Sequence, residues 1–166
     1  MTVATFGERQ EGIQYVNRYG VYAVIPDEKK KNIILVQAPN GAWFLPGGEI
    51  EQGEDHLTAL KRELIEELGF TAHIGQYYGE ADEYFYSRHR DTYFYNPAYI
   101  YEVSHYEKLQ APLEDFNQLA WFPIEEAISK LKRGSHKWEL KCGKRVIKSE
   151  KLFTFLMEKC YNRDRI

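Results

Sequence analysis

The stretch from Gly48 to Phe70 has the sequence GEIEQGEDHLTALKRELIEELGF, and its spacing predicts one amphipathic helix with an acidic face. Between Glu54 and Leu68 there is neither glycine nor proline. Acids after Gly53 should lie in the first turn, where the helix dipole favours them, and Gly69 is a C-terminal stop signal. The residues that recur at helical spacing and that we expect in the core are Leu57, Leu60, Leu64 and Leu68.

Three glutamates of this helix are expected to share one face. Glu63, Glu66 and Glu67 are spaced i, i+3 and i+4, which brings their carboxylates together on a helix. Their mutual repulsion would be offset by a cation, and carboxylate oxygens suit Mg²⁺ or Mn²⁺, often with substrate phosphates as further ligands. The alternative is an acidic face that is only solvated. The LPGG loop at residues 45–48 and the position of Arg62 beside these acids argue against that alternative.

The same stretch resembles the Nudix box, G-x5-E-x7-R-E-U-x-E-E-x-G-U, in which U is a bulky aliphatic or aromatic residue. The fixed positions of the pattern are all filled, by Gly48, Glu54, Arg62, Glu63, Leu64, Glu66, Glu67, Gly69 and Phe70. The resemblance implies one Nudix domain that spans residues 1–166. It also implies the α/β fold of that family, an α/β/α sandwich with a mixed central sheet.

The resemblance further implies an activity. Nudix enzymes are Mg²⁺-dependent pyrophosphohydrolases that cleave nucleoside diphosphates linked to another moiety, by attack of water on phosphorus. The residues that would form the catalytic site are Glu54, Arg62, Glu63, Glu66 and Glu67. Among them Glu66 and Glu67 would bind the metal together with the Gly47 carbonyl oxygen, and Glu63 would be a further ligand or the base. Glu54 and Arg62 would pair to brace the loop against the helix.

Many members of the family recruit one more acid from a loop before the last strand. Here the segment APLEDF at residues 111–116 precedes Trp121 and offers Glu114 or Asp115. The predicted metal set includes Asp115, and the choice between the two acids stays open, as does a loop that is merely polar. The rival acids, on a loop expected earlier in the chain, are Glu80, Asp82 and Glu83.

Aromatic and basic residues after the box bear on the substrate. The clusters YFY at residues 84–86 and 93–95 are suited to stacking on a nucleobase, although sheet core and rim are the more common use. Tyr86 lies where family members that act on diadenosine polyphosphates carry a tyrosine. Arg88 and Arg90 would contact phosphates or cap a hairpin. These three residues are the predicted substrate-binding set, and a nucleoside triphosphate or a dinucleoside polyphosphate is the predicted small-molecule substrate.

Two other functions share this fold. One is a nucleotide-binding module or regulator without catalysis, against which the complete set of box glutamates argues. The other is a prenyl diphosphate isomerase, but the cysteines of the chain, Cys142 and Cys160, lie near the C-terminal end, far from a matching catalytic position.

Composition limits the remaining possibilities. A chain of 166 residues is expected to form one domain, and it has neither a long apolar run nor a signal-peptide pattern. Two cysteines far apart indicate neither a disulfide framework nor a zinc site, so the expected location is cytoplasmic, without membrane contact.

Residues 130–166 hold twelve Lys and Arg against four Asp and Glu, a balance of +8, and the net charge of −3 leaves −11 for residues 1–129. We interpret the basic segment mainly as a solvated helix; nucleic acid is not an expected partner, and a homodimer is compatible with the sequence.

The remaining elements follow from apolar patterns and turn residues. Strands are predicted at residues 19–25, 33–37, 43–45, 70–80, 93–103 and 120–122. Helices are predicted at residues 124–131, after Pro123, and from about 144 to 161.

Overall fold

The computed structural model describes residues 3–142, which form two sheets and three helices. The strands are β1 (Ala4–Phe6), β2 (Val16–Asn17), β3 (Gly20–Val24), β4 (Asn32–Gln37), β5 (Trp43–Phe44), β6 (Gly47–Glu49), β7 (Phe70–Ser87), β8 (Thr92–Lys108) and β9 (Gln118–Pro123). The helices are α1 (His56–Leu68), α2 (Ile124–Lys130) and a third helix at residues 134–142. The helix predicted from about residue 144 to 161 lies outside the described residues. No helix in the described part of the chain is long and apolar enough to cross a membrane.

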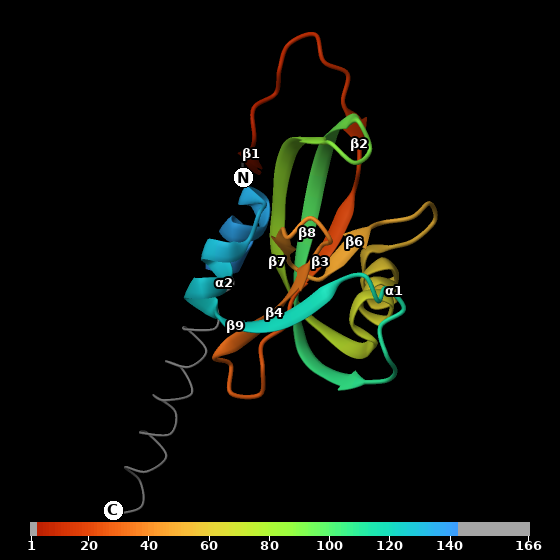
Figure 1. The fold of residues 1–166 in the computed structure, drawn as a ribbon, viewed down its shortest axis with the longest axis vertical. Helices are drawn as coiled ribbons and strands as arrows, with labels where there is room; N and C mark the ends of the chain where they lie inside the picture. Colours follow the sequence, from red (N-terminus) through yellow and green to blue (C-terminus); the bar gives the residue numbers. More distant parts are fainter. Residues whose placement is uncertain (1–2, 143–166) are drawn as a thin grey trace, which may run out of the picture.

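The larger sheet is mixed, as predicted. Its strand order is β1-β7-β8-β3-β6, with β2 paired to β8, and the smaller sheet has the order β5-β4-β9 (Figure 1). β3 is parallel to β8 and antiparallel to β6, while β7 and β8 form a long antiparallel hairpin. The short β6 therefore places the start of the Nudix-like stretch directly beside the central strand β3.

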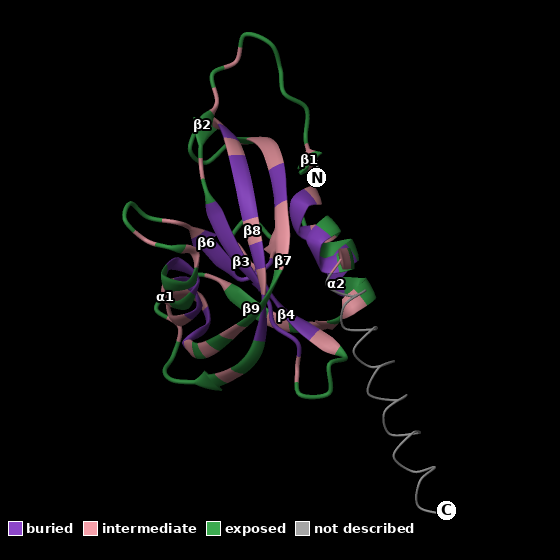
Figure 2. Ribbon diagram, turned by 180° about the vertical axis from the view of Figure 1, so that it is seen from behind, coloured by how far each residue is buried: buried purple, intermediate pink, exposed green. Residues whose placement is uncertain are grey.

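Helices cover both faces of the strands, which confirms the α/β/α prediction (Figure 1). β4 shows why: Ile34 and Val36 pack in a cluster with α1, whereas Ile33 and Leu35 pack in a second cluster with α2 and the third helix. Successive side chains of a strand point to opposite faces, so a run of apolar residues indicates a strand buried on both sides. The central strands are buried and the long N-terminal loop is exposed (Figure 2).

The N-terminal end of α1 differs from the prediction in two details, whereas the C-terminal end agrees with it. Asp55 is the N-cap, where its side chain accepts a hydrogen bond from the Thr58 backbone, and no acid lies in the first turn. Of the two acids predicted in the first turn, Asp55 is therefore the N-cap and Glu54 lies in the loop before the helix. Gly69 ends the helix in the left-handed conformation, as expected. Leu57 was predicted in the core but is 44% exposed, because it lies on the solvent side of the first turn.

The β7–β8 hairpin is longer than predicted. Glu80, Asp82 and Glu83, the acids placed on an earlier loop, lie inside β7, so that prediction is wrong. Alternating tyrosines extend the pairing to the turn, with Tyr84 opposite Tyr95, and such cross-strand aromatic pairs stabilise a hairpin. The acids are therefore distributed over both faces of a strand and do not form a mobile loop ligand.

The third helix contains a buried carboxyl group, that of Glu139. Glu139 is fully buried, and neither of its carboxylate oxygens has a hydrogen-bond partner among residues 3–142. It faces β7, where a Cβ at Gly79 would lie 3.4 Å from Glu139 Oε1. Burial raises the pKa of Glu139 from 4.5 to about 7.

We expect Glu139→Gln to remove part of the pH dependence of stability. The folded pKa of Glu139 is raised, so its contribution is fully present below the unfolded pKa and is lost as the pH rises from 4.5 to about 7. The total loss is about 3 kcal/mol, at about 1.4 kcal/mol for each pKa unit. Urea unfolding at about pH 5 and about pH 8 measures this loss. The free energy of unfolding of the variant should be larger than that of the wild type at the higher pH and similar to it at the lower pH. If the free energy of unfolding changed equally with pH in both proteins, the assignment would be contradicted. Glu8 is an exposed acid, so Glu8→Gln should show the same change with pH as the wild type.

Candidate active site

Two glycines let β6 approach the acidic face of α1. The Gly47 backbone N–H donates to Glu67 Oε2 at 2.9 Å. A Cβ at Gly48 would lie 2.5 Å from the carboxylate atoms of Glu63, so a larger residue there would displace the end of this side chain. Gly47 requires glycine, because a Cβ there would lie 2.1 Å from the Val21 carbonyl oxygen and because its φ is 133°. The two positions thus bring the backbone of the loop against the predicted metal-binding glutamates.

Arg62 connects the loop before α1 to the acidic face. Its Nε and Nη2 donate to the two carboxylate oxygens of Glu54 at 2.7 and 2.9 Å, which is the bidentate pair expected from the sequence. Nη1 donates to Glu63 Oε1 at 2.9 Å and to Glu66 Oε2 at 3.0 Å, and Nη2 donates to the Glu49 carbonyl oxygen at 3.0 Å. The hydrogen bond with Glu54 is the main cause that raises the pKa of Arg62 and lowers the pKa of Glu54.

The glutamates of α1 lie in a negative environment that Arg62 only partly compensates. Desolvation of the carboxyl group raises the pKa of Glu67 well above its ordinary value, and the charges of Glu63, Glu114 and Glu66 raise it further. Desolvation also raises the pKa of Glu63, while its hydrogen bond with Arg62 opposes that shift. Such a site disfavours an additional negative charge and favours a cation.

The loop before β9 brings Glu114, and not Asp115, to this cluster. The backbone N–H groups of Leu113 and Glu114 donate to the Glu66 carbonyl oxygen at 2.9 and 3.0 Å, which holds the loop at the C-terminal end of α1. The charge of Glu114 raises the pKa of two α1 glutamates, whereas Asp115 is exposed. The placement of Asp115 in the predicted metal set is at odds with that position, and the geometry favours the preceding acid.

The donors of the acidic face suit a hard divalent cation, although they do not form a complete site by themselves. Within residues 3–142, no three His, Cys, Asp or Glu side chains are grouped as a metal site. One reason is Arg62, whose Nη1 takes one oxygen each of Glu63 and Glu66. Mg²⁺ usually binds one or two carboxylates together with waters and substrate phosphates, so an open set of carboxylates fits this ion.

One cavity reaches the acidic face at Glu67, and a second cavity shares part of its lining. The inner cavity has a volume of about 190 Å³, and its lining includes Arg18, Tyr22, Gly47 and Glu67. The outer cavity has a volume of about 640 Å³, and its lining includes Phe85, Tyr86, Arg88 and Lys132. Phe44 and Arg133 line both cavities and therefore form the wall between them.

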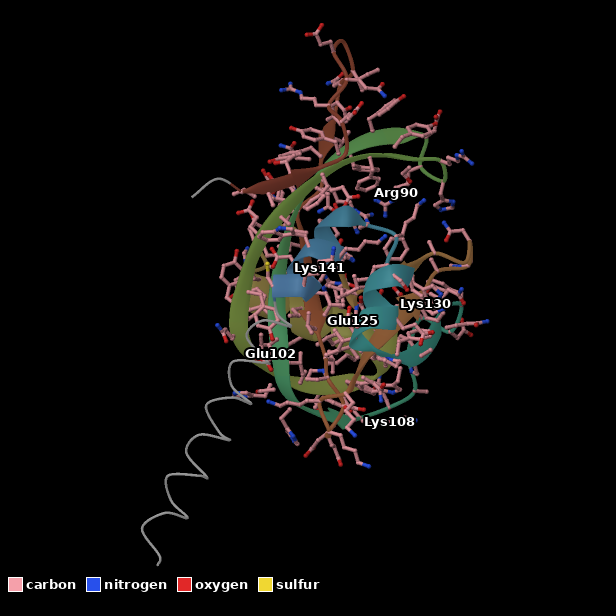
Figure 3. All side chains as sticks on the ribbon, turned by 90° about the vertical axis from the view of Figure 1, so that its left-hand side faces the viewer. Arg90, Glu102, Lys108, Glu125, Lys130 and Lys141 are labelled. Atoms are coloured by element: carbon pink, nitrogen blue, oxygen red, sulfur yellow. The ribbon has the colours of Figure 1, made fainter. Side chains whose placement is uncertain are left out.

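The predicted substrate-binding residues are not all found at these cavities. Tyr86 and Arg88 line the outer cavity. Arg90 does not; its Nη1 lies 3.6 Å from Glu49 Oε2 and its guanidinium lies 5.8 Å from the centre of the Phe94 ring. Figure 3 shows Arg90 toward the end of the molecule where the β7–β8 hairpin turns. Of the three predicted residues, two therefore line the outer cavity and one lies away from it.

Sequence reasoning missed Arg18 and Arg133. The Asn96 side-chain oxygen accepts hydrogen bonds from Arg18 Nη1 at 3.3 Å and from Arg133 Nη1 at 2.7 Å, and Arg18 Nη1 also donates to the Tyr22 hydroxyl at 2.9 Å. Arg18 lies between β2 and β3, Asn96 lies in β8, and Arg133 lies in the segment before the third helix. No pattern in the sequence distinguishes the two arginines from solvated ones.

His136 was also missed, and it supports the loop before β6. Its Nδ1 accepts a hydrogen bond from the Leu45 backbone N–H at 3.2 Å, and its ring centre lies 4.3 Å from that of Tyr22. The side chain is fully buried, and desolvation holds the pKa of His136 well below its ordinary value. The neutral imidazole therefore ties the third helix to the segment that precedes Gly47.

Comparison with known proteins places the chain in a family. The NUDIX domain model matches residues 16–142. The CTP pyrophosphohydrolase of Escherichia coli (strain K12) is 42% identical over 55 residues, which are 30% of this chain and 41% of that protein. The putative 8-oxo-dGTP diphosphatase of Bacillus subtilis (strain 168) is 30% identical over 53 residues, which are 32% of this chain and 36% of that protein. The matches thus cover less than half of the length of these two relatives.

The fold comparison agrees with the family match. The MutT protein of Methanosarcina mazei Go1 superposes with a TM-score of 0.65 at 21% sequence identity, covering 82% of this chain and 99% of that one. This likeness shows the shared fold. Because the family model matches residues 16–142, which include α1, α2, the third helix and every strand except β1, this chain belongs to the Nudix family.

Proposed function

We propose that this protein is a Mg²⁺-dependent pyrophosphohydrolase, with Mn²⁺ able to replace Mg²⁺, that cleaves a nucleoside diphosphate-linked substrate by attack of water on phosphorus. The proposed substrate is a nucleoside triphosphate or a dinucleoside polyphosphate. The observation that carries this proposal is the desolvated carboxyl group of Glu67, which lines the inner cavity and is influenced by the charges of Glu63, Glu66 and Glu114. Two relatives named for nucleotide triphosphate substrates support the substrate class.

The residues that would hold the metal are Glu63, Glu66 and Glu67, together with the Gly47 carbonyl oxygen. When bound, a divalent ion polarises phosphoryl oxygens and lowers the pKa of a bound water. Arg62 would keep the glutamates in place despite their mutual repulsion, because it hydrogen-bonds to Glu63 and Glu66 and is itself held by Glu54. The proton of the attacking water would pass to Glu63 or to another acid.

Chromatographic separation of the products over a nucleotide panel tests the proposal, because hydrolysis of a pyrophosphate bond yields a shorter nucleotide together with pyrophosphate or a second phosphorylated product. The panel contains nucleoside triphosphates, dinucleoside polyphosphates and ADP-ribose, each with Mg²⁺, with Mn²⁺ and with EDTA. We expect turnover of at least one triphosphate or dinucleoside polyphosphate with either ion and none with EDTA. Nucleotide binding without turnover would instead favour a binding module, and rearrangement of a prenyl diphosphate would favour an isomerase.

We expect Glu114→Gln to lower kcat/KM by about 10-fold to 100-fold, the usual effect of losing a charged neighbour of metal ligands. Asp115→Asn, its matched control, should leave kcat/KM within about twofold, because Asp115 is exposed. Steady-state kinetics over a range of Mg²⁺ concentrations compare the two variants. The opposite order of effects would return Asp115 to the metal set.

A further inference from the structure

Arg133 is a cation without a carboxylate partner. Its Nη1 donates to the Asn96 side-chain oxygen, and no carboxylate among residues 3–142 lies within 4.0 Å of its side-chain nitrogens. Arg18, which lines the inner cavity together with Arg133, has Glu49 Oε2 at 3.5 Å from its Nε. Of these two arginines, Arg133 is therefore the one without an acidic side chain within 4.0 Å, and the charge of Glu83 acts on it only from a greater distance.

Aromatic rings hold the Arg133 guanidinium in place. Its Cζ lies 3.9 Å from the centre of the Phe85 ring and 5.5 Å from the centre of the Phe44 ring. Contacts of this kind fix the plane of the guanidinium group but leave several of its five N–H donors for other partners. Desolvation lowers the pKa of Arg133, yet an arginine keeps its charge at neutral pH. A fixed and desolvated cation of this kind attracts an anionic group.

The sizes of the two cavities indicate which anionic group of a ligand would lie beside Arg133. Pockets for small ligands commonly have volumes of about 300 to 1,000 Å³. The outer cavity, at about 640 Å³ and with Phe44, Phe85 and Tyr86 in its lining, has room for a nucleoside. The inner cavity, at about 190 Å³, reaches Glu67 and has room for phosphoryl groups only. A phosphoryl group that links the two would have to lie at the shared wall, where Arg133 stands.

We propose that Arg133 binds the phosphoryl group attached directly to the nucleoside, and that it does not bind the distal phosphates. The identity of this ligand rests on the proposed function. A guanidinium group matches a phosphate in geometry as well as in charge, so Arg133 orients the nucleotide with its base in the outer cavity and its remaining phosphates toward Glu67. Arg133 is thus a substrate-binding residue outside the Nudix box.

Binding measured without metal and without turnover tests this assignment. Nucleosides, nucleoside 5′-monophosphates and inorganic pyrophosphate are titrated separately into the full-length protein in EDTA, and dissociation constants are taken from NMR chemical shifts. For Arg133→Gln we expect monophosphate affinity to fall by about 10-fold to 100-fold, which is the usual effect of losing one charged hydrogen-bond partner. Affinities for nucleosides and for pyrophosphate should stay within about twofold. Arg133→Lys should recover part of the loss, since lysine restores the charge but not the planar, bidentate donor geometry of a guanidinium group.

Lys141→Gln is the matched control, because it removes one positive charge from an exposed position of the third helix, which begins directly after Arg133 (Figure 3). It should change none of the three affinities. A loss of pyrophosphate affinity, an equal loss of nucleoside affinity, or an unchanged monophosphate affinity in Arg133→Gln would overturn the proposal. A wild-type protein that binds no monophosphate would overturn it too. If the glutamine variant fails to fold, the same comparison is made with Arg133→Lys.

Failure of the proposed function has a different signature. A protein that binds monophosphates through Arg133 but hydrolyses nothing in the nucleotide panel would refute the pyrophosphohydrolase and leave the Arg133 assignment standing. If the protein hydrolyses nucleotides and Arg133→Gln keeps the wild-type kcat/KM and monophosphate affinity, the Arg133 assignment is refuted and the pyrophosphohydrolase stands.

Discussion

Glu67→Gln is expected to abolish Mg²⁺-dependent hydrolysis while the fold stays intact. We expect kcat/KM to fall by about 10³-fold, equivalent to about 4 kcal/mol of transition-state stabilisation. Glutamine has nearly the same volume and can still accept the hydrogen bond of the Gly47 backbone N–H, but it cannot supply a negative charge. Because desolvation and neighbouring acids already disfavour the ionised form of Glu67, the melting temperature should not fall.

Steady-state kinetics, a Mg²⁺ titration and a thermal melt together measure this result. Glu107→Gln removes an exposed acid from β8 and should leave activity and melting temperature at wild-type values. Wild-type turnover in Glu67→Gln would remove Glu67 from the proposed metal site. A variant that loses both turnover and its folded state would show that the residue is needed for the fold.

Arg62→Ala is expected to lower stability at least as much as it lowers activity. The guanidinium group bonds to Glu54, Glu63 and Glu66 and to the Glu49 carbonyl oxygen. Its removal leaves several acids close together without a counter-charge, and breaking a buried ion pair in this way costs about 3 to 5 kcal/mol. We place Arg62→Ala toward the lower end, because the side chain is 23% exposed.

Urea unfolding and kcat/KM, both converted to free energies, compare the two effects. Lys61→Ala, the neighbouring exposed position of α1, should stay within about 0.5 kcal/mol of the wild type. Arg62→Lys should recover only part of the loss, because an ammonium group cannot make the bidentate contact with Glu54. An unchanged melting temperature together with lost activity would assign Arg62 to catalysis instead.

Short-range patterns predicted much of this fold. The run of leucines and the absence of glycine and proline placed α1, and the apolar runs placed β3 and β4 within about two residues. These predictions succeeded because periodicity and turn residues act locally, on neighbours a few positions apart in the chain. The same reasoning failed for Asp82 and Glu83, since the local sequence does not show that the tyrosines beyond them extend β7.

The acidic face of α1 was determined by the sequence alone, because a helix brings residues three and four positions apart onto one side whatever surrounds it. Only the tertiary structure decided that Glu114 joins this face, that Gly48 lies against the Glu63 carboxylate, that Arg133 lines the cavities and that His136 accepts a hydrogen bond from Leu45. Those contacts connect residues far apart in the chain, and their positions follow from the packing of β6, β9 and the third helix on the central strands. Spacing therefore accounts for the proposed metal-binding side of the site, and packing accounts for the side proposed to hold the nucleotide.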